Sequence, residues 1–141
     1  MADSFDEIEI RGVLGDCHTI AVVGLSKDSG VVSNHVCSYL KSVGYRIIPV
    51  RPDEDEIMGE QVYRNLQDIP VPVDIVYIFR KTSAVMPFVE EAIKLKPKAI
   101  WLPLGVFSRE AEQVAQTHGV TCIMNTCMMA AHERLRLNSE I

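Results

Sequence analysis

The sequence lacks the segments that carry a protein to or across a membrane. No apolar run approaches the roughly 18 residues that a membrane-spanning helix requires. Residues 1–7 are acidic, whereas a secretory signal begins with basic and then apolar residues. We therefore predict a cytoplasmic protein that has no membrane partner.

Basic residues are also few. The chain has 14 Lys and Arg residues against 19 Asp and Glu residues, which gives a formal net charge of −5. This balance argues against sequence-independent binding of nucleic acid, which needs a positive field. An anionic small ligand needs only local positive charge and backbone N–H groups, so this class of ligand stays open.

Cysteines are present, but not at the spacing of a metal site. None of them forms a CxxC pair, so no structural zinc or other metal is predicted, and each is expected to be a small buried side chain: Cys17, Cys37, Cys122 and Cys127. The chain has 141 residues, of which 48% are hydrophobic and 23% charged. It is thus predicted to form a single domain over residues 1–141, with a core that needs no disulfide.

Apolar runs alternate with segments of helical periodicity. Strands are predicted over 19–24, 45–50, 73–79, 99–102 and 120–124, helices over 33–43, 83–95 and 108–118, and flanking helices over 4–14 and 127–136. The pattern predicts an α/β fold, a Rossmann-like three-layer sandwich with a five-stranded, mostly parallel sheet and helices on both faces. The polar segment 51–72 is predicted to be a loop with at most one or two helical turns.

Ligands of such sheets bind beyond the carboxyl ends of the strands, so the residues after each strand are informative. Gly24 follows the first strand, where it permits a sharp turn and a close approach of ligand to backbone. The next helix directs its N-terminus toward the same place, which favours phosphate. Ser26 and Ser33 add hydroxyl donors, so this turn is predicted to bind a phosphate group.

Basic residues follow three of the predicted strands. Lys27 comes after the first strand, Arg51 after the second, and Arg80 and Lys81 after the third. Because these strand ends meet at one edge of the sheet, the four cations predict one anion site. Gly105 marks a tight turn after the fourth strand, where backbone is predicted to line the same cleft.

An ordinary NAD site fits this pattern less well. Its glycine motif has a middle glycine where this chain has Ser26, and its second strand ends in an acidic residue where this chain has Arg51. Arg51 suits a ligand with a phosphate on its ribose, such as NADP or coenzyme A. Asp53 and Glu54 keep NAD open as an alternative.

No catalytic residue is predicted. Cys127 and His132 lie five residues apart, a spacing that does not stack a nucleophile on its base along a helix. Trp101 is predicted to be a core residue.

Several motifs occur together in the order and spacing of a known family: Ile20–Ser26, Gly44–Val50, Glu56–Gly59, Val73–Val76, Phe79-Arg80 and Ala99–Leu102. Over about residues 18–135 the chain resembles the CoA-binding-domain proteins, which are similar to the N-terminal domain of the succinyl-CoA synthetase α subunit. The resemblance implies that coenzyme A or an acyl-CoA binds across the strand ends.

By position, the resemblance implies that Gly24, Leu25 and Ser26 hold the diphosphate. Arg51 and Pro52 would lie near the adenosine, and Phe79 and Arg80 near the pantetheine or a phosphate. The chain departs from the family at Arg51, where an asparagine is usual. It also departs in 127–132, where the family usually has a lysine and a glutamate.

The leading hypothesis is a CoA-binding module without a complete catalytic site. One alternative is an NADP-binding oxidoreductase or redox sensor. Another is an interaction protein with a vestigial nucleotide pocket. The sequence leaves open whether the chain forms a homo-oligomer or binds a partner protein.

Overall fold

The protein is a three-layer α/β sandwich around one parallel sheet. The computed structural model describes residues 7–139, with side chains up to Leu135. The sheet has the order β2-β1-β5-β6-β7, and all neighbours are parallel: β1 (Thr19–Val23), β2 (Arg46–Val50), β5 (Ile75–Ile78), β6 (Ala99–Trp101) and β7 (Thr121–Ile123). The predicted fold class and the five predicted strands are confirmed.

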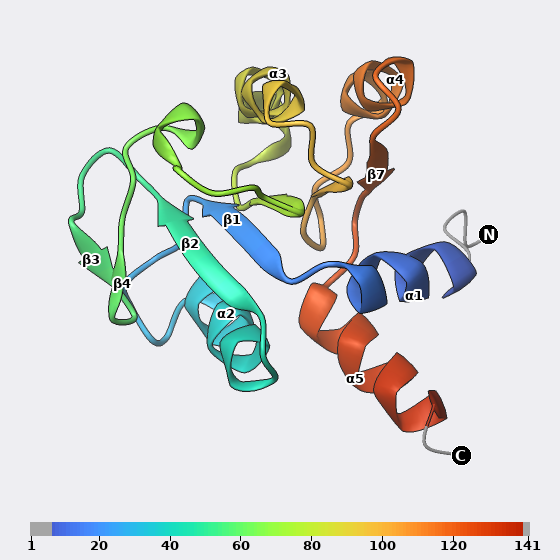
Figure 1. Ribbon diagram of the computed structural model, residues 1–141, viewed down its shortest axis with the longest axis horizontal. Coiled ribbons are helices and arrows are strands. Elements are labelled where there is room, and N and C mark those ends of the chain that lie inside the picture. Colours follow the sequence, from blue (N-terminus) through green and yellow to red (C-terminus); the bar gives the residue numbers. More distant parts are fainter. Residues whose placement is uncertain (1–6, 140–141) are drawn as a thin grey trace.

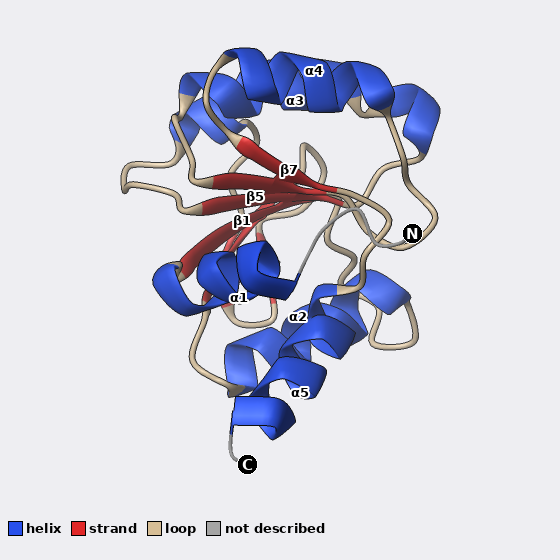
Figure 2. Ribbon diagram, turned by 90° about the vertical axis from the view of Figure 1, so that its right-hand side faces the viewer, coloured by secondary structure: helices blue, strands red, loops and turns tan. Residues whose placement is uncertain are grey.

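Helices cover both faces of the sheet (Figures 1 and 2). On one face lie α1 (Glu7–Asp16), α2 (Val32–Ser42) and α5 (Met128–Ser139), and on the other lie α3 (Met86–Lys94) and α4 (Arg109–Thr117). The bounds agree with the predicted helices within a few residues. The start of the predicted helix over 4–14 lies outside the described residues.

The core has two halves, one on each side of the sheet. Strand residues alternate between them, because successive side chains of a strand point to opposite faces. Ile20 and Val22 pack toward α1, α2 and α5, whereas Ala21 and Val23 pack toward α3 and α4. Burial on both faces explains why this strand is a continuous apolar run.

Two buried side chains fix the carboxyl end of the central strands. Trp101 is fully buried, as predicted, and its indole N–H donates to the Thr126 carbonyl at 2.8 Å. Tyr77 is also fully buried, and its hydroxyl accepts the Met128 N–H at 3.3 Å. Both contacts tie the start of α5 to the sheet.

The segment between β2 and β5 differs from its prediction. It contains the expected helical turn, a 3-10 turn over Leu66–Asp68, but also an unpredicted hairpin of β3 (Glu56–Ile57) and β4 (Glu60–Gln61). Met58 and Gly59 form its turn with φ angles of 57° and 77°, the combination that a two-residue hairpin turn requires. Lys41 of α2 holds this turn by donating to the Met58 carbonyl at 2.7 Å.

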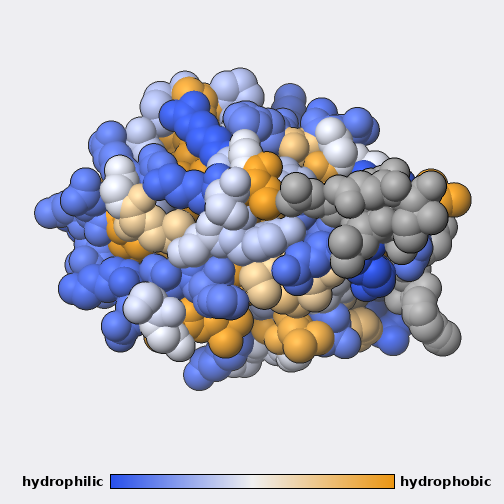
Figure 3. Space-filling view, turned by 90° about the horizontal axis from the view of Figure 1, so that it is seen from below, coloured by the Kyte–Doolittle hydropathy of each residue, from blue (hydrophilic) through white to orange (hydrophobic). Residues whose placement is uncertain are grey.

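The surface over α2 and α5 is mainly hydrophilic. Figure 3 shows this face, on which hydrophobic side chains appear in small, separate groups. Among the described residues, no helix is long and apolar enough to cross a membrane.

Candidate functional site

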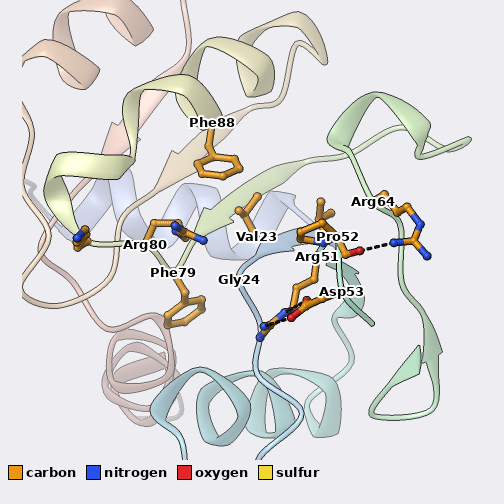
Figure 4. Close-up of a pocket in the computed structure, with 11 residues that line it drawn as sticks. Val23, Gly24, Arg51, Pro52, Asp53, Arg64, Phe79, Arg80 and Phe88 are labelled. Atoms are coloured by element: carbon orange, nitrogen blue, oxygen red, sulfur yellow. Dashed lines mark hydrogen bonds and ion pairs between the residues drawn. The ribbon is translucent and has the colours of Figure 1, made fainter. Parts of the chain in front are cut away.

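A cleft of about 540 Å³ opens at the carboxyl ends of β1, β2 and β5. This edge of a parallel sheet is where ligands of such folds bind. The lining residues come from the three strand ends, the segment after β2 and the first turn of α3 (Figure 4): Val23, Gly24, Val50, Arg51, Pro52, Asp53, Arg64, Phe79, Arg80, Lys81 and Phe88.

Gly24 lies where the backbone after β1 closely approaches the end of β5. Its φ is +82°, and a Cβ atom at this position would lie 2.6 Å from the Phe79 carbonyl oxygen. Its N–H donates to the Val50 carbonyl at 3.1 Å. Only glycine combines this conformation with this approach, so Gly24 brings the ends of all three strands together.

The connection from β1 to α2 is held by its own hydrogen bonds. The Ser26 N–H donates to Ser33 Oγ at 3.0 Å, and the Asp28 N–H donates to Ser26 Oγ at 3.0 Å. Asn34 Nδ2 donates to the Ser26 carbonyl at 2.9 Å. Leu25 and Ser33 are buried. Leu25, Ser26 and Ser33 therefore shape this loop, and their side chains do not line the cleft.

Arg51 points toward Asp53 and not into open space. Its Nε donates to Asp53 Oδ1 at 2.9 Å and its second terminal nitrogen donates to Oδ2 at 3.0 Å (Figure 4). Its first terminal nitrogen donates to the Leu25 carbonyl at 3.2 Å. The hydrogen bond with Asp53 raises the pKa of Arg51, and the same bond lowers the pKa of Asp53. Both groups are therefore charged at neutral pH.

Two further cations beside the cleft also have acidic partners in the segment after β2. Lys27 pairs with Glu54 at 3.3 Å, and its side chain is otherwise exposed. Arg64 lies 3.5 Å from Asp55 and also donates to the Pro52 carbonyl. Residues 53–55 thus supply one carboxylate to each of the three cations.

The β5 side of the cleft is different. Arg80 stacks its guanidinium on the Phe88 ring, 5.6 Å from the centroid, and extends into the cleft (Figure 4). The Phe79 ring packs on Tyr77 with a centroid distance of 4.3 Å. Within residues 7–135, no carboxylate lies within ion-pair distance of Arg80 or Lys81. These two cations are available to an anion from solvent.

The predicted site residues fall into three sets. The structure brings six of them together in the cleft: Gly24, Arg51, Pro52, Phe79, Arg80 and Lys81. Leu25, Ser26 and Lys27 lie in the adjoining loop, and Ser33 lies in the first turn of α2 after it. Gly105 does not line the cleft, and its N–H donates to Asn125 Oδ1 at 2.8 Å in the turn beyond β6.

Sequence reasoning missed some lining residues. Arg64 lies in a segment with no periodicity that would predict its direction. Phe88 fits the apolar face of its helix, which is the pattern of a core residue. Pro87, however, marks the first turn of this helix. Because the helix follows β5, an aromatic residue in its first turn lies near the carboxyl ends of the strands. That position was the signal available for Phe88.

The cysteines and His132 lie apart from the cleft. Cys17, Cys37 and Cys122 are buried as predicted, and burial raises their pKa to about 11, 12 and 12. The prediction was wrong for Cys127, which is only half-buried because it precedes α5 at the rim of the core. His132 Nδ1 lies 2.7 Å from the Tyr39 hydroxyl. In the described residues, no group of three or more His, Cys, Asp or Glu side chains is placed to hold a metal.

Comparison with known sequences decides the family. Residues 18–133 match the sequence profile of the CoA binding domain, which is most of the chain. The chain belongs to this CoA-binding domain family. Structural neighbours in this family share the same Rossmann-like α/β fold.

Relatives within and around the CoA-binding domain family differ in length. The uncharacterized protein YneT of Bacillus subtilis is 36% identical over 124 residues, which is 88% of this chain and 92% of that protein. The ADP-forming acetate–CoA ligase of Methanocaldococcus jannaschii is 24% identical over 129 residues, 86% of this chain but 18% of the ligase. The chain thus spans about a fifth of the length of this ligase.

A solved structure of a hypothetical protein from Pyrococcus horikoshii has the same fold. It superimposes with a TM-score of 0.91 at 36% identity, and the match covers 96% of this chain and 95% of that one.

Proposed function

We propose that this CoA-binding domain binds coenzyme A or an acyl-CoA through its nucleotide moiety in the cleft at the ends of β1, β2 and β5. The observation that carries the proposal is that the Gly24 backbone lines the same cleft as Arg80 and Lys81. These two cations have no carboxylate partner among the described residues. Glycine allows a close approach to a diphosphate, and the cations balance its charge. The match to CoA ligases supports the same ligand.

The cleft suggests which part of the ligand lies where. The diphosphate would lie between Gly24 and the Arg80 guanidinium. The apolar side chains of Val50 and Pro52 offer a surface for the adenine ring, and Arg51 lies next to them in the chain. Phe79 and Phe88 provide apolar contacts for the rest of the molecule. A cleft of about 540 Å³ is in the range of small-molecule sites.

We further propose that the domain is a binding module without a complete catalytic site. Among the residues that the structure describes, Asp53 is the carboxylate that lines the cleft. Its bonds to Arg51 lower its pKa, so it is a poor proton donor or acceptor at neutral pH. Cys127 and His132 do not line the cleft, and His132 Nδ1 is engaged by Tyr39.

A thermal-shift panel with coenzyme A, acetyl-CoA, NAD, NADP and ATP tests the proposal. A ligand at 100 times its dissociation constant adds about 2.7 kcal/mol to the free energy of unfolding, which raises the midpoint of a chain this long by on the order of 10 °C. We expect this shift with the two CoA species. A shift with NADP alone would support the oxidoreductase alternative, and no shift with any of them would contradict nucleotide binding.

A further inference from the structure

The charges around the cleft are arranged asymmetrically. On the β2 side, Arg51, Lys27 and Arg64 each pair with a carboxylate of residues 53–55. On the β5 side, Arg80 and Lys81 have no such partner within the described residues. An anionic ligand therefore meets open cations on one side and occupied cations on the other.

Asp53 holds Arg51 in the geometry that a phosphate would use. Two parallel N–H···O bonds of 2.9 and 3.0 Å join the guanidinium to both carboxylate oxygens, which is the bidentate arrangement that arginine also makes with phosphate. The Asp53 side chain is 59% exposed and the Arg51 side chain 28% exposed, and both line the cleft. A ligand phosphate and the Asp53 carboxylate thus compete for the same donors.

We propose that Asp53 is a specificity-determining residue that competes with ligand phosphate for Arg51. It thereby sets how strongly the site distinguishes a ribose-phosphorylated nucleotide from an unphosphorylated one. This inference rests on the proposed function. The diphosphate, which faces Arg80, binds without competition. A phosphate on the ribose binds Arg51 only after Asp53 has released it.

The competition has a measurable size. The affinity for a group that needs a free Arg51 falls in proportion to the fraction of molecules in which Arg51 is free. An exposed ion pair of good geometry lowers the fraction of molecules with a free arginine by about fivefold. Removing the Asp53 charge should therefore tighten binding of the ribose-phosphorylated ligand by about fivefold, whereas a ligand without that phosphate gains little.

Coenzyme A and 3′-dephospho-coenzyme A are the matched probes, because they differ only in the ribose phosphate. We would measure both dissociation constants by calorimetry for the wild type, Asp53→Asn and Asp16→Asn. Asp16 is an exposed carboxylate at the opposite edge of the sheet, so Asp16→Asn controls for net charge. Asp53→Asn should raise the preference for coenzyme A about fivefold, and Asp16→Asn should leave it at the wild-type value.

A second background shows whether Asp53 acts through Arg51. In Arg51→Gln the site has lost the contested donor, so adding Asp53→Asn should no longer change the preference. An unchanged preference in the Asp53→Asn single variant, with both ligands still binding, would overturn this inference and leave the proposed function intact. Binding of neither ligand by the wild type and Asp53→Asn would overturn both.

Discussion

The single substitution Gly24→Ala should both destabilise the protein and weaken ligand binding. Alanine at φ +82° lies in the left-handed region, which costs an L-residue about 1–2 kcal/mol. Its Cβ would also lie 2.6 Å from the Phe79 carbonyl oxygen, closer than two such atoms can approach. The end of β5 cannot yield freely, because the Phe79 N–H is bonded to the Val23 carbonyl at 2.9 Å.

These two terms set the expected magnitude. The conformational cost and the contact together should lower the free energy of unfolding by at least about 2 kcal/mol, which lowers the thermal midpoint of a chain this long by about 8 °C. A displaced Phe79 carries Arg80 with it. Affinity for coenzyme A should therefore fall by about tenfold or more, when it is measured well below the new midpoint.

Gly30→Ala is the matched control for this experiment. Gly30 lies in the same β1–α2 connection, its φ is not positive, and a Cβ atom at this position would meet nothing within 4 Å. Thermal denaturation and calorimetry with coenzyme A should find this variant close to the wild type. If Gly24→Ala melted at the wild-type temperature and bound coenzyme A as tightly, the proposed role of Gly24 would be refuted.

Three further predictions concern the fold. Asp74 Oδ2 accepts the His18 and Thr19 N–H groups at 2.8 and 3.0 Å, and although burial raises its pKa, these bonds outweigh burial and hold the pKa below the ordinary value. The stability that the ionised Asp74 carboxylate contributes is present above the unfolded pKa of about 3.9 and is lost as pH falls through the folded pKa. When urea midpoints are measured over a pH series, Asp74→Asn should therefore reduce the loss of stability at acid pH. An unchanged slope would contradict this prediction. Trp101→Phe removes the bond to the Thr126 carbonyl and should cost about 1–3 kcal/mol in urea unfolding, whereas wild-type stability would show that the bond contributes nothing. Burial raises the pKa of Cys37 to about 12, so mass spectrometry should find this thiol unmodified by an alkylating reagent at pH 8 in the native protein and modified in urea; rapid native labelling would contradict its burial.

The central strands β1 and β5 could be predicted because they are buried on both faces. Residues 19–23 and 75–78 carry long apolar runs that only a two-sided core explains. The hairpin of β3 and β4 could not be predicted in the same way. Its strands have two residues each, too few for any periodicity, and Met58 adopts a positive φ that its residue type does not favour.

The site was predictable to the extent that it depends on the strand ends. Arg51, Arg80 and Lys81 follow strands directly, so the topology alone brings them to one edge. The pairing of Arg51 with Asp53 depends on the conformation of the chain after β2 and on rotamers, which no sequence pattern specifies. Gly105 follows a strand as well, but its turn is bonded to Asn125 and lies outside the cleft.

Coenzyme A is proposed to bind in the cleft beside Arg80. Calorimetric titration of coenzyme A into the wild type, Arg80→Gln and Arg46→Gln tests it most directly. Arg46 is an exposed arginine at the start of β2, at the opposite edge of the sheet, so its replacement is a matched control. We predict one binding site per chain, at least tenfold weaker binding in Arg80→Gln, which corresponds to about 1.4 kcal/mol, and wild-type affinity in Arg46→Gln. Equal affinity in all three proteins would contradict binding of coenzyme A beside Arg80.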